Sequence, residues 1–149
     1  EQNYGGIDGD SASLAELLAL LSTITEYPLR QDLAITGSMN QKGMAQPIGG
    51  VNQKIEGYYK TCKVKGLTGK QGVIIPVQNK DNLMLEDEVL ASVKEDEFSI
   101  YAVEDIDEAI ELMFDRPAEE VHKKVNENLE ELALKAQKFG KEDDNKKEE

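Results

Sequence analysis

Ser11 and Lys54 are the two side chains of this sequence that together permit nucleophilic chemistry on a carbonyl group. A serine hydroxyl becomes a strong nucleophile when a base removes its proton, and a neutral lysine amine can serve as that base. Ser11 stands in GIDGDSAS, directly before an alanine- and leucine-rich run, and Lys54 follows 43 residues later in PIGGVNQKI. The less specific interpretations are a helix cap for Ser11 and an ordinary surface position for Lys54.

The surroundings of both residues favour this chemistry. Ser11 at the start of a helix would have backbone N–H groups and the positive end of the helix dipole nearby, and both stabilise an oxyanion. Lys54 acts as a base only when its amine is neutral, which burial in an apolar pocket favours. The Gly49-Gly50 bend before it allows another segment to approach closely. We therefore expect the amine of Lys54 in a dry pocket, within bonding distance of Ser11.

Other kinds of catalytic site are poorly represented. The single histidine, His122, lies in a charged C-terminal stretch and would have to fold back onto the core to complete a Ser-His-Asp triad. One histidine and one cysteine are too few for the usual zinc ligand sets. The stretch GLTGKQG, residues 66–72, lacks the spacing of a nucleotide-binding P-loop. We therefore expect no metal and no cofactor bound by this chain.

The composition limits the partners and the compartment. The net charge of −13 argues against a nucleic-acid surface and against docking on anionic lipid. No stretch approaches 18 consecutive apolar residues, so no membrane span is expected. The lone Cys62 forms no disulfide within the chain and is expected to be a buried, inert thiol. A reducing, cytoplasmic environment fits this cysteine content.

Helical and strand patterns alternate along the chain, which predicts an α/β (α+β) sandwich with helices packed on a sheet. The apolar run GVIIPV is typical of a strand buried inside that sheet. Short apolar pieces on either side of a polar NQKG turn predict a β-hairpin. The predicted helices cover residues 11–26, 51–65, part of 81–94 and 105–114, and the predicted strands cover 33–35, 44–48, 72–77 and 98–103.

The C-terminal region differs from the rest. Pro117 is expected to close the compact part, which divides the chain into residues 1–116 and a charged segment at 117–149. Residues 118–139 carry a narrow apolar stripe on an otherwise charged helix, and this stripe would either dock on the domain or bind a partner helix. The final KEDDNKKEE is predicted to be disordered. The stripe consists of Val121, Val125, Leu129, Leu132 and Ala136.

Four segments, taken in order, resemble the proteolytic domain of the Lon protease family. They are GIDGDSAS, AITG, PIGGVNQK and GVIIP, and the resemblance covers roughly residues 4 to 114. It implies that Ser11 is the nucleophile and Lys54 the catalytic lysine. It also implies that the hydroxyl of Thr36, in AITG, lies near the lysine amine. The family fold has β-structure ahead of the serine loop, so we expect those N-terminal strands to be cut from this chain or supplied by a separate piece.

The resemblance also suggests roles for the residues before Ser11. A carboxylate at Asp8 would favour a charged amine, so we interpret Asp8 as a gate that pairs with Lys54 at rest and turns away during catalysis. The alternative is a loop acid bonded to local N–H groups. Gly9 permits a turn that a side chain would hinder, and the N–H groups of residues 9–11 are the expected oxyanion donors. Many Lon proteins have proline followed by Ser-Ala-Gly where this sequence has Asp10 and then Ser11-Ala12-Ser13. This variant resembles a divergent Lon-like branch, some members of which have a degenerate ATPase part, so it leaves the ATP dependence open.

The expected function is therefore that of a serine endopeptidase with a Ser-Lys dyad. Its implied substrates are unfolded or misfolded polypeptides, its implied assembly is a hexameric ring of identical chains, and any ATP would act through an ATPase region outside this chain. Two alternatives to the endopeptidase remain open. The domain is either a catalytically silent, ring-forming scaffold, or an amidase that uses the same dyad on small molecules.

Overall fold

The computed structural model describes residues 9–145 and the side chains of residues 9–139. Its centre is a parallel sheet with the strand order β1 (Leu33–Ile35), β4 (Gly72–Pro76) and β5 (Ser99–Val103). Every residue of β4 is buried, because this strand lies between two neighbours and is covered on both faces. Gly72 pairs with Leu33 on one side and Ser99 on the other. The expected α+β sandwich is confirmed.

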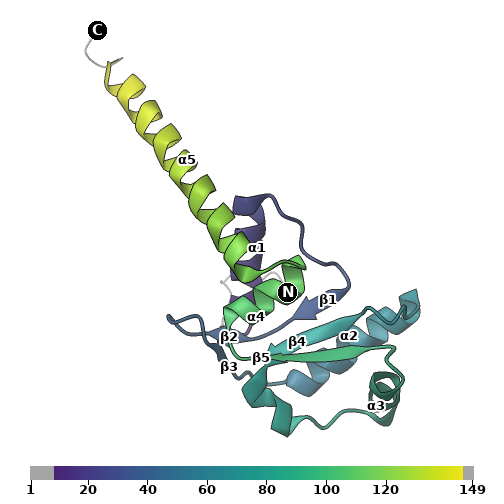
Figure 1. Cartoon of the computed structure of the whole chain (residues 1–149). Coiled ribbons are helices and arrows are strands. Elements are labelled where there is room, and N and C mark those ends of the chain that lie inside the picture. The colour runs from purple at the N-terminus through teal and green to yellow at the C-terminus, as the bar shows by residue number, and fades with distance from the viewer. Residues whose placement is uncertain (1–8, 146–149) are drawn as a thin grey trace.

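Helices cover both faces of this sheet (Figure 1). On one face α1 (Ser13–Thr25), α4 (Ile106–Phe114) and the first turns of α5 (Ala118–Asn145) pack around Ile74. On the other face α2 (Val51–Lys65) and α3 (Asp87–Lys94) pack around Val73 and Ile75. Successive side chains of β4 thus enter opposite cores, as the two-residue period of a strand requires.

The predicted hairpin is correct only around its turn. The antiparallel pair consists of β2 (Ser38–Met39) and β3 (Ala45–Gln46), on either side of the NQKG turn. The segment Leu33–Ile35 was expected to form one arm, but it is β1 and pairs in parallel with β4. The apolar residues of β1 form part of the central sheet. The chain leaves that sheet at Thr36-Gly37.

The predicted helices are found with small shifts at their ends. The helix at 51–65 matches α2. Helix α4 is capped by Asp105, which accepts a hydrogen bond from the N–H of Glu108 at 3.1 Å. The helix expected within 81–94 is α3, preceded by the 3-10 segment Val77–Asn82. The first helix begins at Ser13 instead of Ser11, which places Ser11 in the preceding turn.

Helix α5 continues well beyond the body of the molecule (Figure 1). Val121 is fully buried in the core beside α1, and Asn128 donates a hydrogen bond to the backbone oxygen of Ile24 at 2.6 Å. The apolar stripe therefore docks on the domain over its first half. The disorder predicted for residues 141–149 is wrong as far as Asn145, because the helix continues to that residue. The remaining four residues lie outside the described part of the chain.

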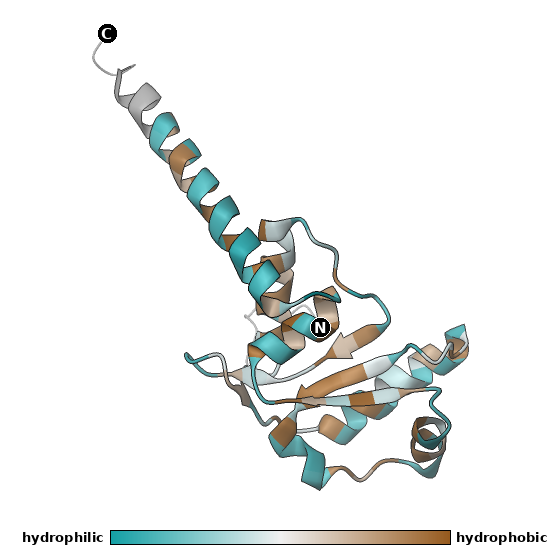
Figure 2. Ribbon diagram, viewed as in Figure 1, coloured by the Kyte–Doolittle hydropathy of each residue, from teal (hydrophilic) through white to brown (hydrophobic). Residues whose placement is uncertain are grey.

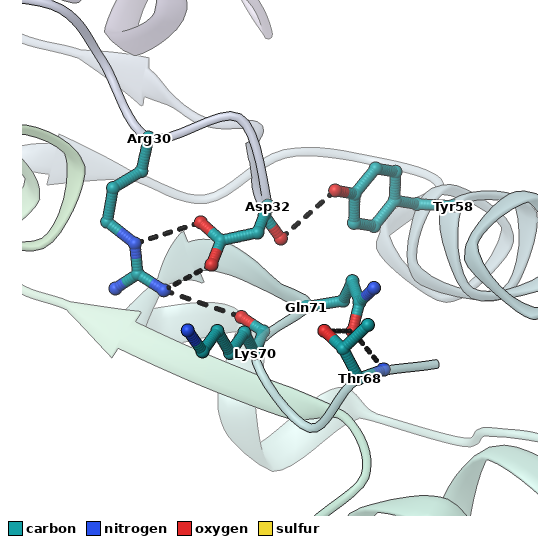
Figure 3. A network of polar contacts seen from close by, with 6 residues as sticks. All are labelled: Arg30, Asp32, Tyr58, Thr68, Lys70 and Gln71. Atoms are coloured by element: carbon teal, nitrogen blue, oxygen red, sulfur yellow. Dashed lines mark hydrogen bonds and ion pairs between the residues drawn. The ribbon is translucent and has the colours of Figure 1, made fainter. Parts of the chain in front are cut away.

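A polar network joins the beginnings of β1 and β4 (Figure 3). Arg30 donates two hydrogen bonds of 2.9 Å to Asp32 and one of 3.4 Å to the backbone oxygen of Lys70. The hydroxyl of Tyr58, on α2, donates to the backbone oxygen of Asp32 at 3.1 Å. The hydrogen bonds from Arg30 hold the pKa of Asp32 below its usual range, and burial raises the pKa of Tyr58 to about 12. This network lies at the start of β1, the strand that ends at Ile35, directly before Thr36.

Candidate active site

Ser11 lies in a turn whose geometry leaves its hydroxyl unused by the helix that follows. The N-cap of α1 is Ala12, which makes no side-chain capping bond. The capping interactions come from neighbours, since the backbone oxygen of Asp10 accepts from the N–H of Ser13 at 3.0 Å and from its hydroxyl at 2.7 Å. Gly9 adopts a φ of +102°, which favours glycine. The interpretation of Ser11 as the helix cap is therefore wrong.

Lys54 reaches this turn from the first turn of α2. Its Nζ lies 3.0 Å from Ser11 Oγ and 3.2 Å from Thr36 Oγ1. Buried Val51 and Ile55 fix α2 against the sheet on either side of Lys54 in sequence. The chain enters the helix through Gly50, whose φ of +68° favours glycine. The PIGG segment thus sets the direction from which the lysine approaches the serine.

Thr36 connects the two residues at the end of β1. Its side chain is nearly buried, and its Oγ1 donates to the backbone oxygen of Ser11 at 3.1 Å while accepting from Lys54. Its own N–H donates to Ile74 of β4 at 3.1 Å, which ties it to the central strand. The hydroxyl can therefore orient the amine without adding charge to the site.

Gly37 and Ser38 also hold the serine turn by hydrogen bonds, and the sequence analysis did not predict this role. We call these two residues the cradle of the serine turn. Gly37 donates its N–H to the backbone oxygen of Ser11 at 2.9 Å and accepts from the N–H of Leu14 at 3.2 Å. The buried Ser38 donates its hydroxyl to Asp10 Oδ2 at 2.7 Å. Their position directly after Thr36, in AITGS, was the only signal in the sequence.

Comparison with known proteins identifies the family. The model of the Lon protease (S16) C-terminal proteolytic domain matches residues 5–116. This chain belongs to that family. A Lon protease homolog of Haemophilus influenzae is 51% identical over 133 residues, which are 89% of this chain and 22% of the relative. A homolog of Escherichia coli K12 is 51% identical over 113 residues, 76% of this chain and 19% of the relative.

A more distant relative is the archaeal Lon protease of Pyrococcus abyssi, with 36% identity over 130 residues. That match covers 86% of this chain and 12% of the relative. The chain thus spans about a fifth or less of the length of these three relatives. It corresponds to the proteolytic part of much longer proteins, and the resemblance inferred from the four sequence segments is confirmed.

One expectation about this Lon proteolytic domain is corrected. The amine of Lys54 was expected in a dry pocket, but Lys54 is an exposed residue and Ser11 is only partly buried. The reason is local, because the site lies where the turn before α1, the end of β1 and the start of α2 meet at the surface. The described residues bring the two groups together but do not exclude water from them.

The other predicted residues fall into three groups. Gly9 and Asp10 lie in the serine turn, and Asp8 lies outside the described residues. His122 lies 2.7 Å from Asp107 of α4 and takes no part in the serine site, while Cys62 is buried on α2 as expected. Within residues 9–139, no group of three His, Cys, Asp or Glu side chains is placed to hold a metal. Among the helices described, none is long and apolar enough to cross a membrane.

Proposed function

We propose that this Lon proteolytic domain is a serine endopeptidase in which Ser11 is the nucleophile and Lys54 the general base. The observation that supports this most strongly is the 3.0 Å separation between Lys54 Nζ and Ser11 Oγ. A general base must lie within about 3.2 Å of the proton's oxygen, and this pair already does so without substrate. At this distance a proton can pass from Ser11 Oγ to Lys54 Nζ and back again.

The proposed reaction proceeds in two stages. Ser11 Oγ attacks the carbonyl carbon of a peptide bond while neutral Lys54 takes the hydroxyl proton. The C–N bond then breaks, Lys54 returns that proton to the leaving amine, and an ester forms on Ser11. Water attacks this ester, again giving a proton to Lys54, which passes it back to Ser11 Oγ as the ester bond breaks. We assign the N–H groups of residues 9–11 to the oxyanion that develops in each stage.

Two features of the site support this assignment. Thr36 holds the amine by a hydroxyl, which does not stabilise the charged amine as a carboxylate would. The nearest carboxylate in the described serine turn, that of Asp10, is bonded to Ser38. The exposure of Lys54 sets a requirement, because a lysine acts as a general base only when its amine is neutral. In this proposal the bound polypeptide, or other parts of the longer protein, cover the amine and remove its water.

The wider biological setting is also a proposal. We infer that the substrates are unfolded or misfolded polypeptides, that the active form is a homo-oligomeric, hexameric ring, and that any ATP acts through a region outside this chain. We further propose a cytoplasmic location and no nucleic-acid or membrane partner, given the charge of −13 and the single free cysteine.

The exposure of Lys54 favours one rival, a domain that assembles while the dyad stays silent. Incubation with casein separates the two functions. The endopeptidase cleaves casein, and both Ser11→Ala and Lys54→Ala abolish cleavage while circular dichroism stays unchanged. Lys65→Ala is the matched control, since it removes an exposed lysine from the same helix. If the parent chain, and any longer protein that contains it, leave both casein and short esters intact, the scaffold is correct. Cleavage of short esters alone would indicate the amidase.

A further inference from the structure

Asn79 is a buried polar side chain that the proposed reaction does not use. It lies in the 3-10 segment Val77–Asn82, which Figure 2 shows as mostly hydrophilic after the hydrophobic ribbon of β4, yet only 5% of Asn79 is exposed. Its Oδ1 accepts from the N–H of Ile48 at 3.1 Å, and its Nδ2 donates to the backbone oxygen of Ile48 at 2.9 Å. Asn79 thus holds both backbone groups of one residue, as the opposite residue of a hydrogen-bonded antiparallel pair does.

The residue that Asn79 holds is the last one before the bend that leads into α2. Gly49 and Gly50 follow Ile48, and both are exposed. Two consecutive glycines restrain a chain weakly, because each adopts many backbone conformations. The first turn of α2 comes directly after them, and there the N–H of Lys54 donates to the backbone oxygen of Gly50 at 3.2 Å. The hydrogen bonds from Asn79 therefore restrain the chain just ahead of the turn that carries the lysine.

Thr36, which also contacts the lysine amine, is tied to the same part of the chain as Ile48. The N–H of Thr36 donates to the backbone oxygen of Ile74 in β4 at 3.1 Å. Asn79 follows Pro76, the last residue of β4, by three residues. The segment 74–79 therefore supports both the hydroxyl that orients the amine and the entry of the helix that carries it.

We propose that Asn79 is a positioning residue for Lys54. Its two hydrogen bonds to Ile48 set where α2 begins, and they keep the lysine amine within hydrogen-bond distance of Ser11 Oγ. Asn79 acts through Ile48 and the first turn of α2, and not by contact with the reacting atoms. A displacement of about 1 Å in an active site can lower a rate about 100-fold. This inference rests on the proposed function, because the position of the amine matters for catalysis only if Lys54 is the base.

Casein cleavage by two variants measures the catalytic effect of the hydrogen bonds. Asn79→Ala removes both of them, and Asn79→Leu removes both while keeping a side chain of similar size. Each should lower kcat about 10-fold or more and change KM little, because the base is displaced while the substrate contacts remain. Asn128→Ala is the matched control, since it also removes an amide that donates to a backbone oxygen, that of Ile24 near the far end of α1. This control should cleave casein like the parent chain.

Hydrogen exchange at the backbone amide of Lys54 tests the positioning without requiring activity. The rate at this amide is compared with the rates at the amides of β4, which report global unfolding. In both Asn79 variants this ratio should rise about 10-fold or more, because the first turn of α2 opens locally once Ile48 is released. A purely structural role of Asn79 would accelerate all these amides together and leave the ratio unchanged. Asn128→Ala should also leave it unchanged.

The two measurements separate this proposal from the proposed function. An exchange ratio that neither Asn79 variant raises, or that Asn128→Ala raises equally, would overturn the positioning role. So would parent-like cleavage by Asn79→Leu in an assay where Ser11→Ala is inactive, because the amine would then be placed without these hydrogen bonds. In a parent chain that leaves casein intact, a selective rise of the ratio would still support the position set by Asn79, although the proposed function would lack support.

Discussion

Ser38 donates its buried hydroxyl to the carboxylate of Asp10 at 2.7 Å, and this bond joins the hairpin to the residue immediately before the proposed nucleophile. Together with the hydrogen bonds from Thr36 and Gly37 to the backbone oxygen of Ser11, it holds the serine turn in place from three consecutive residues. A catalytic serine must be held close to its productive geometry, and small displacements reduce rates strongly. The segment 36–38 is thus the support of the site.

Removing the Ser38 hydroxyl should therefore impair catalysis more than stability. Ser38→Ala loses one hydrogen bond, which costs about 0.5–1.5 kcal/mol of unfolding free energy. The serine turn becomes less fixed, so kcat for casein cleavage should fall while KM changes little. Asp10→Ala should act similarly, and the double variant should be no worse than either single one, because both remove the same bond. Strictly additive losses would show that the two side chains act independently.

Gly37 should tolerate no side chain. A Cβ at this position would lie 2.5 Å from Leu14 Cδ1 and 3.0 Å from Pro76 Cγ. Leu14 is fully buried, so moving its Cδ1 away would disturb the core, and Gly37→Ala should lower the free energy of unfolding by about 1–3 kcal/mol. Urea denaturation measures the difference. Gly49→Ala is the control, since a Cβ there has nothing within 4 Å. Equal stability of the two variants would contradict this packing.

The ion pair between Arg30 and Asp32 should make stability depend on pH in the acid range. Arg30 lowers the pKa of Asp32 in the folded state below the ordinary value of 3.8, so the carboxylate contributes stability above that pH. This contribution disappears as the pH falls through the lowered folded pKa. Arg30→Gln should cost at most about 1 kcal/mol near pH 7, and the difference from the parent chain should vanish in strong acid. A difference that is constant with pH would exclude this linkage.

Asp8→Asn tests the gate that the family resemblance suggests. A carboxylate that pairs with Lys54 at rest favours the charged, inactive amine, so its removal should leave casein cleavage unchanged or raise it. The measurement is the initial rate of cleavage at a fixed pH, with Glu16→Gln as a control for the loss of one acid near the site. A loss of activity by orders of magnitude would show instead that the carboxylate is needed.

Much of this architecture could be predicted from the sequence, because its signals are local. The apolar GVIIP run predicted the buried central strand, and the helical pattern at 51–65 predicted both ends of α2. The partner of β1 could not be predicted, since the short LAI segment suits a hairpin arm and a parallel strand equally. Parallel pairing is decided by contacts between Leu33 and Gly72, which are distant in sequence.

The candidate active site was likewise predicted from the sequence only in part. The family resemblance pointed to Ser11, Lys54 and Thr36 as site residues, and these three side chains lie together in the structure. The cradle of Gly37 and Ser38 depends on where the hairpin meets the serine turn, which no local pattern records. The exposure of Lys54 was also unpredictable, because burial depends on contacts between segments that are distant in sequence.

The central claim is that Lys54 takes the proton of Ser11, and Lys54→Arg tests it most directly. Arginine keeps the positive charge and similar length but does not lose its proton in proteins, so it cannot act as the base. The initial rate of casein cleavage, measured in the 149-residue chain or in a longer protein that contains it, should fall about 100-fold or more. Thermal unfolding should stay close to that of the parent. A Lys54→Arg variant that cleaves casein within a few-fold of the parent rate would contradict the account.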